Sequence, residues 1–220
     1  MTVTRAERDA AATVAVGWGV ILAAVLAVGW LLTHSLEPSI GVWDDDAARW
    51  FTAERTGDLG RIADVGRLLG DTWVGIGLAL AVAVAVSLWQ HSLRPAIFVV
   101  VLMAGNFGFY LVATQLITRD RPPVPILDPG LVPDHSFPSG HVATAVAVYG
   151  GTALLVGYLR PRTRPWIWAL LVMPVLVAVA RLYQGAHHPT DVLTSLLAMT
   201  AWLTVVARVL LTGTAARAPG

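Results

Sequence analysis

Long runs without a charged side chain constrain the fold of this sequence more than any other feature. Six runs lack Asp, Glu, Lys and Arg. Four of them are long, at 10–36, 72–93, 95–118 and 135–159. The other two, 165–180 and 192–207, are shorter, but a helix could extend each of them past the charged residue at its border. A bilayer core of about 30 Å is crossed by about 20 helical residues. The sequence therefore predicts six transmembrane helices, at 14–33, 73–90, 97–117, 142–159, 165–182 and 191–211.

The composition agrees with an all-α integral membrane protein. Of the 220 residues, 56% are hydrophobic and only 13% are charged, whereas soluble domains carry about 25% charged residues. So much apolar surface also excludes a disordered chain. The formal net charge of +1 argues against nucleic acid as a partner. Because the sequence has no cysteine, disulfides, a thiolate nucleophile and cysteine-ligated metals are excluded.

The arginines predict how the helices are oriented. The segment 34–72 lies on one side of the predicted bundle and contains eight acidic residues and four arginines. The other side carries most of the remaining arginines: Arg5, Arg8, Arg94, Arg160, Arg162, Arg164, Arg208 and Arg217. By the positive-inside rule, both termini are expected in the cytoplasm. The first helix is expected to be a signal anchor, since its apolar run is too long for a cleaved signal peptide.

The segment 34–72 is the one long stretch expected outside the bilayer. Its apolar residues recur at helical spacing, which is typical of short amphipathic helices lying on a membrane surface. Such helices could form a packed cap over the bundle or a gate for a substrate. We expect a single membrane domain over 1–220, with loops at 118–141 and 183–191 carrying the functional residues.

Polar residues gather where the predicted helices end. Ionisable residues near a bilayer are candidates for function. Because the third and fifth helices exit on the face where the fourth and sixth enter, alternating topology places four polar groups together. The four groups are Arg119-Asp120-Arg121, His135 with Ser139-Gly140-His141, Arg181, and His187-His188 with Asp191.

This cluster has the chemistry of a phosphate site. Arginine supplies fixed positive charge and planar, bidentate hydrogen bonding. Two helices begin at this face, and helix N-termini favour anions. Pro138 and Pro189 are expected in the first turns of these helices, and Gly140 lets the backbone approach a ligand closely. A phosphate or diphosphate is the simplest ligand for such a cluster.

Two histidines and an aspartate add the chemistry of phosphoryl transfer. His187 and Asp191 are four residues apart, one helical turn, so the carboxylate can hold one imidazole nitrogen. The other nitrogen is then free as a nucleophile. His141 could give a proton to the leaving group. Phosphoryl transfer through a phosphohistidine would need no metal or other cofactor.

These residues resemble the type 2 phosphatidic acid phosphatases (PAP2), a membrane branch of a superfamily that includes vanadium haloperoxidases. The family motifs are Lys-x6-Arg-Pro, Pro-Ser-Gly-His and Ser-Arg-x5-His-x3-Asp. This sequence has Arg121-Pro122, then Pro138-Ser139-Gly140-His141, and then Arg181-x5-His187-x3-Asp191. The stretch 44–71 is similar to the first periplasmic segment of bacterial members.

The resemblance implies a role for each matching residue. His187 is the nucleophile, Asp191 orients it, and His141 protonates the leaving group. Phosphate oxygens are held by Arg121, Arg181, Ser139 and the Gly140 backbone. The family acts without metal on lipid phosphates or diphosphates, and a bacterial member is expected in the inner membrane with its site on the outer face.

Two positions depart from the family motifs. Thr114 stands where the first motif has lysine, and Ala180 stands where the third has serine. Arg119 is the candidate replacement for the missing cation, because it lies two residues before Arg121. Without such a replacement, one lost charge-assisted contact would weaken phosphate binding by about 1.5–3 kcal/mol.

Three other functions compete with a phosphatase. A metal could be bound by His141, His187, His188 and Asp191, although the arginine cluster would repel a cation. An intramembrane serine protease could pair Ser139 with a histidine. A non-catalytic lipid-phosphate binder or transporter is favoured by Thr114. Replacing His187 with alanine separates these functions, since only the phosphatase must lose turnover.

Overall fold

The computed structural model describes residues 4–212, so Arg217 lies outside the described residues. Every regular element of this range is helical, in agreement with the all-α prediction. In chain order the elements are α1 (Arg5–Thr33), η1 (Glu37–Gly41), α2 (Val42–Ala53), α3 (Gly57–Gly70), α4 (Thr72–Gln90), α5 (Arg94–Leu116), α6 (Gly140–Ala145), η2 (Val146–Gly150), α7 (Gly151–Leu159), η3 (Pro161–Thr163), α8 (Arg164–Ile167), η4 (Trp168–Leu171), α9 (Val172–Tyr183), α10 (Pro189–Ala207) and η5 (Arg208–Thr212).

Six of the helical stretches between residues 4 and 212 are long and apolar enough to cross a membrane, which confirms the predicted number. The fourth is α6, η2 and α7 in sequence, and the fifth runs from η3 through α9. The six stretches are Arg5–Thr33, Thr72–Gln90, Arg94–Leu116, Gly140–Leu159, Pro161–Tyr183 and Pro189–Thr212. The observed helices begin between one and nine residues before the predicted starts, and polar residues cap two of these extensions, α1 and α4. Thr4 caps α1, for example, and Glu7 bonds back to the Thr4 backbone.

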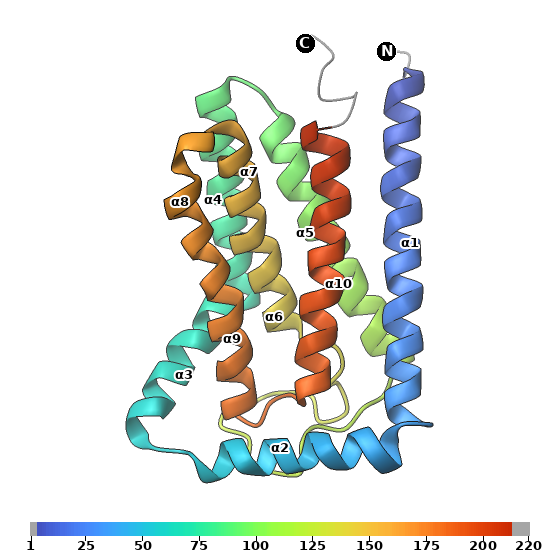
Figure 1. Ribbon diagram of the computed structural model, residues 1–220, viewed down its shortest axis with the longest axis vertical. Helices are drawn as coiled ribbons and strands as arrows, with labels where there is room; N and C mark the ends of the chain where they lie inside the picture. Colours follow the sequence, from blue (N-terminus) through green and yellow to red (C-terminus); the bar gives the residue numbers. More distant parts are fainter. Residues whose placement is uncertain (1–3, 213–220) are drawn as a thin grey trace.

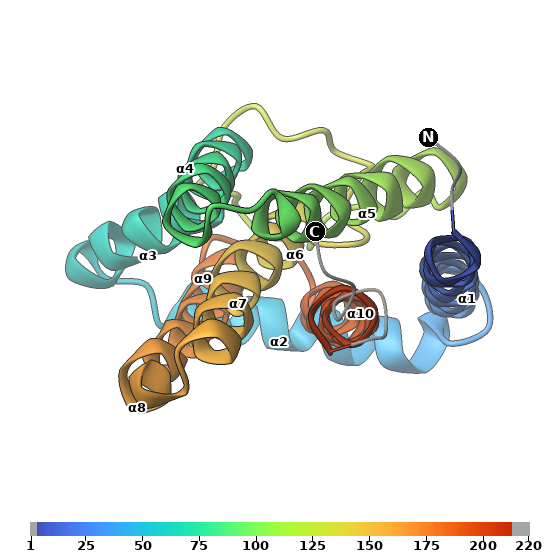
Figure 2. The same cartoon turned by 90° about the horizontal axis from the view of Figure 1, so that it is seen from above.

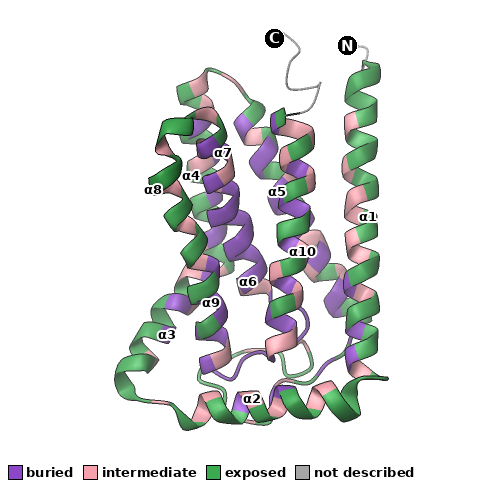
Figure 3. Cartoon of the chain, in the orientation of Figure 1, coloured by how far each residue is buried: buried purple, intermediate pink, exposed green. Residues whose placement is uncertain are grey.

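The fourth spanning helix is the centre of the bundle. Figure 3 shows the stretch from α6 to α7 mostly buried or half-buried, whereas α1 and α8 are largely exposed. Seen from above, α4, α5, α9 and α10 surround the central helix, and α1 lies outermost beside α10 (Figure 2). Apolar side chains on the outward faces are suited to lipid contact.

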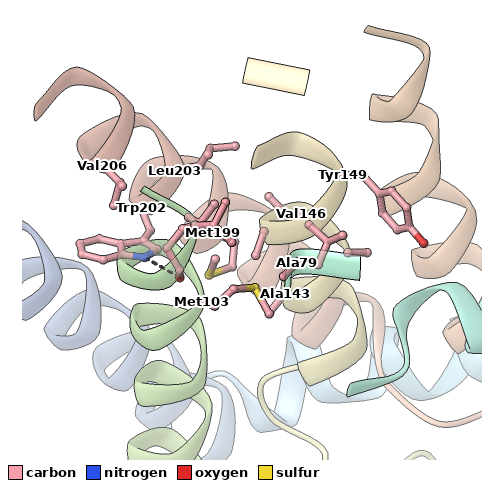
Figure 4. Packing of buried hydrophobic residues seen from close by; sticks show 14 of the residues in the cluster. Ala79, Met103, Ala143, Val146, Tyr149, Met199, Trp202, Leu203 and Val206 are labelled. Carbon is pink, nitrogen blue, oxygen red and sulfur yellow. Dashed lines mark hydrogen bonds between the residues drawn. The ribbon is translucent and has the colours of Figure 1, made fainter. Parts of the chain in front are cut away.

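Small residues let the helices approach closely. Trp202 of α10 donates its indole N–H to the Leu102 carbonyl of α5 at 3.1 Å (Figure 4). A Cβ added to Gly105 would lie only 2.3 Å from the Trp202 ring, so only glycine fits beneath the indole. Deeper in the bundle, Asn106 donates to the Thr144 hydroxyl at 3.2 Å and joins α5 to α6. These contacts between distant helices are typical of membrane bundles.

The segment after α1 forms short helices, as its pattern predicts. Helix α2 lies across the lower end of the bundle, and α3 leans against α9 (Figure 1). Gly66 of α3 packs on Ala180, since a Cβ added to Gly66 would lie 2.5 Å from the Ala180 Cβ. The outward faces carry exposed apolar side chains, which suit a membrane surface: Trp43, Trp50, Leu59, Ile62, Val65 and Leu68.

Candidate active site

The candidate site lies at the end of the bundle covered by α2. Helices α5 and α9 end here, and α6 and α10 begin here. The loop 117–139 folds back on itself, because Arg119 accepts a backbone hydrogen bond from Ser136 and donates one to Asp134, both at 3.0 Å. The loop 184–188 joins α9 to α10. The structure therefore brings the predicted polar groups together at one end.

A tight turn after α9 positions His187. Gly185 adopts φ +69°, and the amides of Gly185 and Ala186 bond back to Leu182 and Arg181 at 3.0 and 3.1 Å. This is the Schellman arrangement, which favours glycine at the left-handed position. The chain then turns directly into α10, which has Pro189 at its first position, as expected. His187 is thus held just before the helix.

The Nδ1 atom of His187 hydrogen-bonds to the carbonyl oxygen of Ser136 at 2.7 Å. Because a carbonyl only accepts, Nδ1 carries the hydrogen and Nε2 keeps a free electron pair. Burial lowers the pKa of His187 to about 4. The charges of Arg181 and Arg121 also lower this pKa, whereas Asp191 raises it. His187 is therefore neutral at physiological pH, as a nucleophile requires.

Asp191 lies close to His187 but is held mainly by other groups. The distance from Asp191 Oδ2 to His187 Nδ1 is 3.8 Å, which is longer than a hydrogen bond. Oδ2 instead accepts from the Ser136 hydroxyl at 2.6 Å and from the His188 amide at 2.9 Å. The predicted helical spacing is wrong in detail, since α10 begins at Pro189 and His187 precedes it.

His141 and His187 line the same pocket of about 300 Å³. Within residues 4–212, no protein group forms a hydrogen bond with the His141 ring. The rest of the pocket wall is mixed, with polar atoms beside apolar side chains: Thr72, Asn106, Phe107, Tyr110, Leu111, Arg121, Leu131, His135, Gly140 and Thr144. Both histidines are thus available to a bound molecule.

Ser139 stands at the N-cap of α6, but its side chain does not cap the helix. The helix begins at Gly140, so Pro138 precedes the first turn and is not part of it as expected. The Ser139 hydroxyl is fully buried and finds no hydrogen-bond partner within residues 4–212. A buried hydroxyl without a partner costs about 1–3 kcal/mol of folding free energy. A ligand that accepts a hydrogen bond from Ser139 would remove this cost.

Arg181 is fully buried at the end of α9. Its Nη1 donates to Asp128 at 2.8 Å and to Gln184 at 2.9 Å. Its Nε and Nη2 are buried and without a partner in the part of the chain from 4 to 212. A guanidinium with one end anchored and two donors free is suited to a phosphate or carboxylate oxygen pair.

Arg121 is also anchored by the protein. Its Nε donates to Val132 at 2.8 Å, and its Nη1 and Nη2 donate to Ala186 and His135 at 2.5 and 3.0 Å, all to carbonyl oxygens. Burial lowers the pKa of Arg121, and the charge of Arg181 lowers it further. Arg121 lines the pocket of the two histidines and joins both active-site loops.

Arg119 is placed differently from the expectation that it replaces the missing lysine. Its guanidinium lies between the carboxylates of Asp44 and Asp191 and does not line the pocket of His141 and His187. Burial alone would lower the pKa of Arg119, but the two carboxylates outweigh burial and raise it. Thr114 bonds to the Tyr110 carbonyl of its own helix at 2.9 Å, so it supplies no donor to the pocket either.

The geometry bears on two of the competing functions. Between residues 4 and 212, no group of three or more His, Asp or Glu side chains is arranged to hold a metal ion. Both ring nitrogens of His188 already face carboxylates, since Nε2 lies 3.2 Å from Asp45 Oδ1 and Nδ1 lies 3.4 Å from Asp191 Oδ2. A serine protease needs Ser139 bonded to a histidine, whereas the Ser139 hydroxyl has no partner within the described range.

Three residues of this end were missed by sequence reasoning. Ser136 is fully buried and joins Asp191 to His187; its position just before the Pro-Ser-Gly-His motif was an available signal. Asp128 anchors Arg181, and Asp44 anchors Arg119. No spacing rule could reveal these two, because each partner lies more than 50 residues away.

Two known proteins are similar to this chain in sequence. An undecaprenyl-diphosphatase of Sulfolobus acidocaldarius is 34% identical over 97 residues, which are 44% of this chain and 43% of that protein. The undecaprenyl-diphosphatase BcrC of Bacillus subtilis is 38% identical over 104 residues, 44% of this chain and 50% of BcrC. The chain thus spans about half the length of these relatives.

A solved structure is similar to this chain over most of the fold. It is the crystal structure of a transmembrane PAP2 type phosphatidylglycerolphosphate phosphatase from Bacillus subtilis. The TM-score is 0.73 at 20% identity, covering 86% of this chain and 93% of that one. The sequence profile of the PAP2 superfamily matches residues 94–214, which include all three motifs. This chain belongs to the PAP2 superfamily.

Proposed function

We propose that this protein is a membrane phosphatase that hydrolyses a lipid phosphate or diphosphate through a phosphohistidine on His187. The observation that carries the proposal is the set of buried, unpartnered donors beside two histidines, each of which has a ring nitrogen available to a ligand. Arg181 Nε, Arg181 Nη2 and Ser139 Oγ have no partner within residues 4–212, and His141 shares a pocket with His187. A phosphoryl group would satisfy these donors and present phosphorus to His187.

The first half of the reaction transfers the phosphoryl group. His187 Nε2 attacks phosphorus, so that an N–P bond forms while the bond from phosphorus to the leaving oxygen breaks. His141 gives its proton to that oxygen. Arg181, Ser139 and the Gly140 amide stabilise the charge on the other phosphate oxygens. The Ser136 carbonyl keeps the hydrogen of His187 on Nδ1, which leaves the electron pair of Nε2 available for the attack.

The second half releases inorganic phosphate. Water attacks phosphorus, gives a proton to His141, and the N–P bond breaks to restore neutral His187. Phospho-His187 carries positive charge on its ring, and the Asp191 carboxylate, 3.8 Å from Nδ1, stabilises that charge. No metal enters either step.

Polyprenyl diphosphates are the substrate class that we favour. Both curated relatives are named as undecaprenyl-diphosphatases. Phe107 and Leu111 of α5 line the pocket beside the histidines, which suits a substrate whose apolar tail stays in the bilayer. We place the site on the outer face of a bacterial inner membrane, because the first turn of α1 and the last turn of η5 lie at the opposite end of the bundle (Figure 1). At that opposite end arginines outnumber acidic residues, whereas at the end with the site acidic residues outnumber arginines.

The test is phosphate release by the purified, detergent-solubilised protein with a chelator present. Polyprenyl diphosphate, phosphatidylglycerol phosphate and phosphatidic acid are compared, using wild type and His187→Ala. We expect release that needs His187 and ranks the diphosphate first. His91→Asn is the matched control. His91 is exposed and caps the C-terminus of α4 in the left-handed backbone conformation, which asparagine tolerates.

Three results would reject the proposal. Full turnover by His187→Ala would exclude the phosphohistidine. No release by folded wild-type protein from any lipid would favour the non-catalytic binder or transporter, because Thr114 and Ala180 would then mark a degenerate site. Phosphate release that the chelator abolishes would favour the alternative of a metal-dependent enzyme.

A further inference from the structure

We infer that Asp44 and Arg119 are positioning residues of this phosphatase, and that they hold Asp191 in place from helix α2. The inference rests on the proposed function, since it concerns the carboxylate beside the proposed nucleophile. It gives α2 a role in catalysis beyond covering the end of the bundle. It also replaces the expectation that Arg119 binds the substrate phosphate.

The contacts of Arg119 support this role. Its Nη2 donates to Asp44 Oδ2 at 2.7 Å, and its Nη1 donates to Asp191 Oδ1 and to the Thr190 hydroxyl, the latter at 2.8 Å. The side chains of Asp44 and Asp191 are 0% exposed, and that of Arg119 is 8% exposed. A charge buried to this degree needs partners, and Arg119 finds them in two carboxylates rather than in the pocket.

Asp44 ties this arginine to the start of α10. Its two carboxylate oxygens accept from the Thr190 amide at 3.1 Å and from the Thr190 hydroxyl at 2.5 Å. Thr190 is the second residue of α10, next to Asp191. Asp44 therefore fixes both Arg119 and the turn that carries Asp191.

The effect reaches His187 through Ser136. Asp191 accepts from the Ser136 hydroxyl, and the Ser136 carbonyl accepts from His187 Nδ1. A shift of Asp191 would therefore move the group that sets the orientation of the nucleophile. Asp191 also faces the ring that becomes positive in the phosphohistidine. The pair Asp44 and Arg119 thus acts on the chemical step and not on substrate binding.

The three consecutive aspartates of α2 provide a control within the chain. Asp44 is fully buried, and Asp45 reaches His188. Asp46 pairs only with Arg49 and its side chain is 67% exposed. Asp46→Asn therefore makes the same chemical change on the same helix without touching Arg119.

The experiment measures kcat and KM for purified wild type and the variants Asp44→Asn, Arg119→Gln, Arg119→Lys and Asp46→Asn, with polyprenyl diphosphate in detergent. We expect Asp44→Asn and Arg119→Gln to lower kcat about tenfold to hundredfold, since each removes a charge-assisted contact. KM should stay within about twofold. Arg119→Lys keeps the charge but cannot bridge both carboxylates as the guanidinium does, so it should recover only part of kcat, and Asp46→Asn should match wild type.

Double variants test the proposed route. Where Asp191→Asn is already present, Asp44→Asn should lower kcat no further, because both act through the same carboxylate. Should Asp44→Asn fail to fold, Thr190→Val removes the hydroxyl that joins Asp44 to Arg119, and a kcat loss of about tenfold is expected. The melting temperature of each variant, measured in parallel, shows whether the variant is folded at the temperature of the activity assay.

Several outcomes would overturn the proposal. A raised KM with unchanged kcat in Arg119→Gln would make Arg119 a substrate ligand. A lowered melting temperature with unchanged kcat of the folded protein would make the contacts purely structural. Full kcat in Asp44→Asn and Thr190→Val, with wild-type turnover that needs His187, overturns this proposal alone. Wild type without His187-dependent turnover overturns the proposed function and this proposal with it.

Discussion

The two sides of the polar end differ in how their buried charges are satisfied. On one side, Asp44, Arg119, Thr190 and Asp191 form a closed network in which every carboxylate oxygen has a donor. We call this the paired side. On the other side, which we call the open side, Arg181 and Ser139 keep three buried polar atoms without partners in the described chain.

This difference separates support from ligand binding. A buried polar atom without a partner costs about 1–3 kcal/mol, and native proteins keep few of them. The open side bears this cost at three atoms, Arg181 Nε, Arg181 Nη2 and Ser139 Oγ. Under the proposed function, a substrate phosphate satisfies them. The paired side leaves little capacity for a ligand and is instead suited to hold catalytic groups still.

Breaking the paired side should cause the largest loss of stability. Asp44→Ala leaves Arg119 and two Thr190 donors without their acceptor. Removing one member of a buried ion pair costs about 3–5 kcal/mol, which corresponds to about 10 °C or more for a protein of this size. Thermal unfolding in detergent measures the loss.

Asp46→Ala is the matched control, because the Asp46 side chain is 67% exposed and its partner Arg49 is also on the surface. Surface ion pairs contribute about 0–1 kcal/mol. Equal melting temperatures for Asp44→Ala and Asp46→Ala would contradict the existence of the paired side.

Breaking the open side should reduce activity more than stability. Arg181→Lys keeps a cation for Asp128 but loses the two unpartnered donors. Two charge-assisted hydrogen bonds at about 1.5–3 kcal/mol each predict a loss of at least about hundredfold in kcat/KM. The measurement is phosphate release at several substrate concentrations. Arg61→Lys, at an exposed position that pairs with Asp58, should retain wild-type kcat/KM.

The pH dependence of stability tests the environment of His187, which lies between the two sides. Its pKa is lowered from 6.5 to about 4 on folding, so the unfolded chain binds a proton between these values and the folded chain does not. Stability is therefore complete above pH 6.5 and decreases as the pH falls toward 4. The loss from this group is at most about 3 kcal/mol.

Thermal unfolding between pH 4 and 7 checks this dependence against His187→Gln, which lacks the titrating ring. The wild type should lose more stability on acidification than the variant. His34→Gln, on the exposed end of α1, should follow the wild type. Parallel curves for wild type and His187→Gln would show that His187 is not held neutral by burial.

The bundle could be predicted from the sequence because its signals are local. Six apolar stretches of spanning length identify the helices, and alternation alone brings their polar ends to one face. The same holds for Gly185 and Pro189, whose turn and helix start are encoded within a few residues. The backbone preferences of glycine and proline do not depend on contacts with distant parts of the chain.

The paired side could not be predicted, since its contacts join distant segments. Asp44 and Arg119 are 75 residues apart, and nothing in their own neighbourhoods distinguishes Asp44 from Asp45 or Asp46. The spacing of His187 and Asp191 also misled, because it assumed a helix that begins only at Pro189. Burial, which decides these contacts, is a property of the folded chain.

The smallest predicted effect gives the sharpest contrast between the two sides. Ser139→Ala removes a buried hydroxyl that has no partner within residues 4–212, so the folded protein loses no hydrogen bond and avoids a desolvation cost. The melting temperature without ligand should stay the same or rise slightly. Turnover should nevertheless fall, because the hydroxyl is one of the donors for the substrate phosphate.

One hydrogen bond to a charged phosphate oxygen is worth about 1.5–3 kcal/mol, so kcat/KM for Ser139→Ala should fall about tenfold to hundredfold. Ser136→Ala is the opposite case, since the Ser136 hydroxyl already donates to Asp191 at 2.6 Å. It should lower the melting temperature as well as kcat. A stability loss in Ser139→Ala as large as that in Ser136→Ala would show that the Ser139 hydroxyl serves the fold, and the distinction between an open and a paired side would fail.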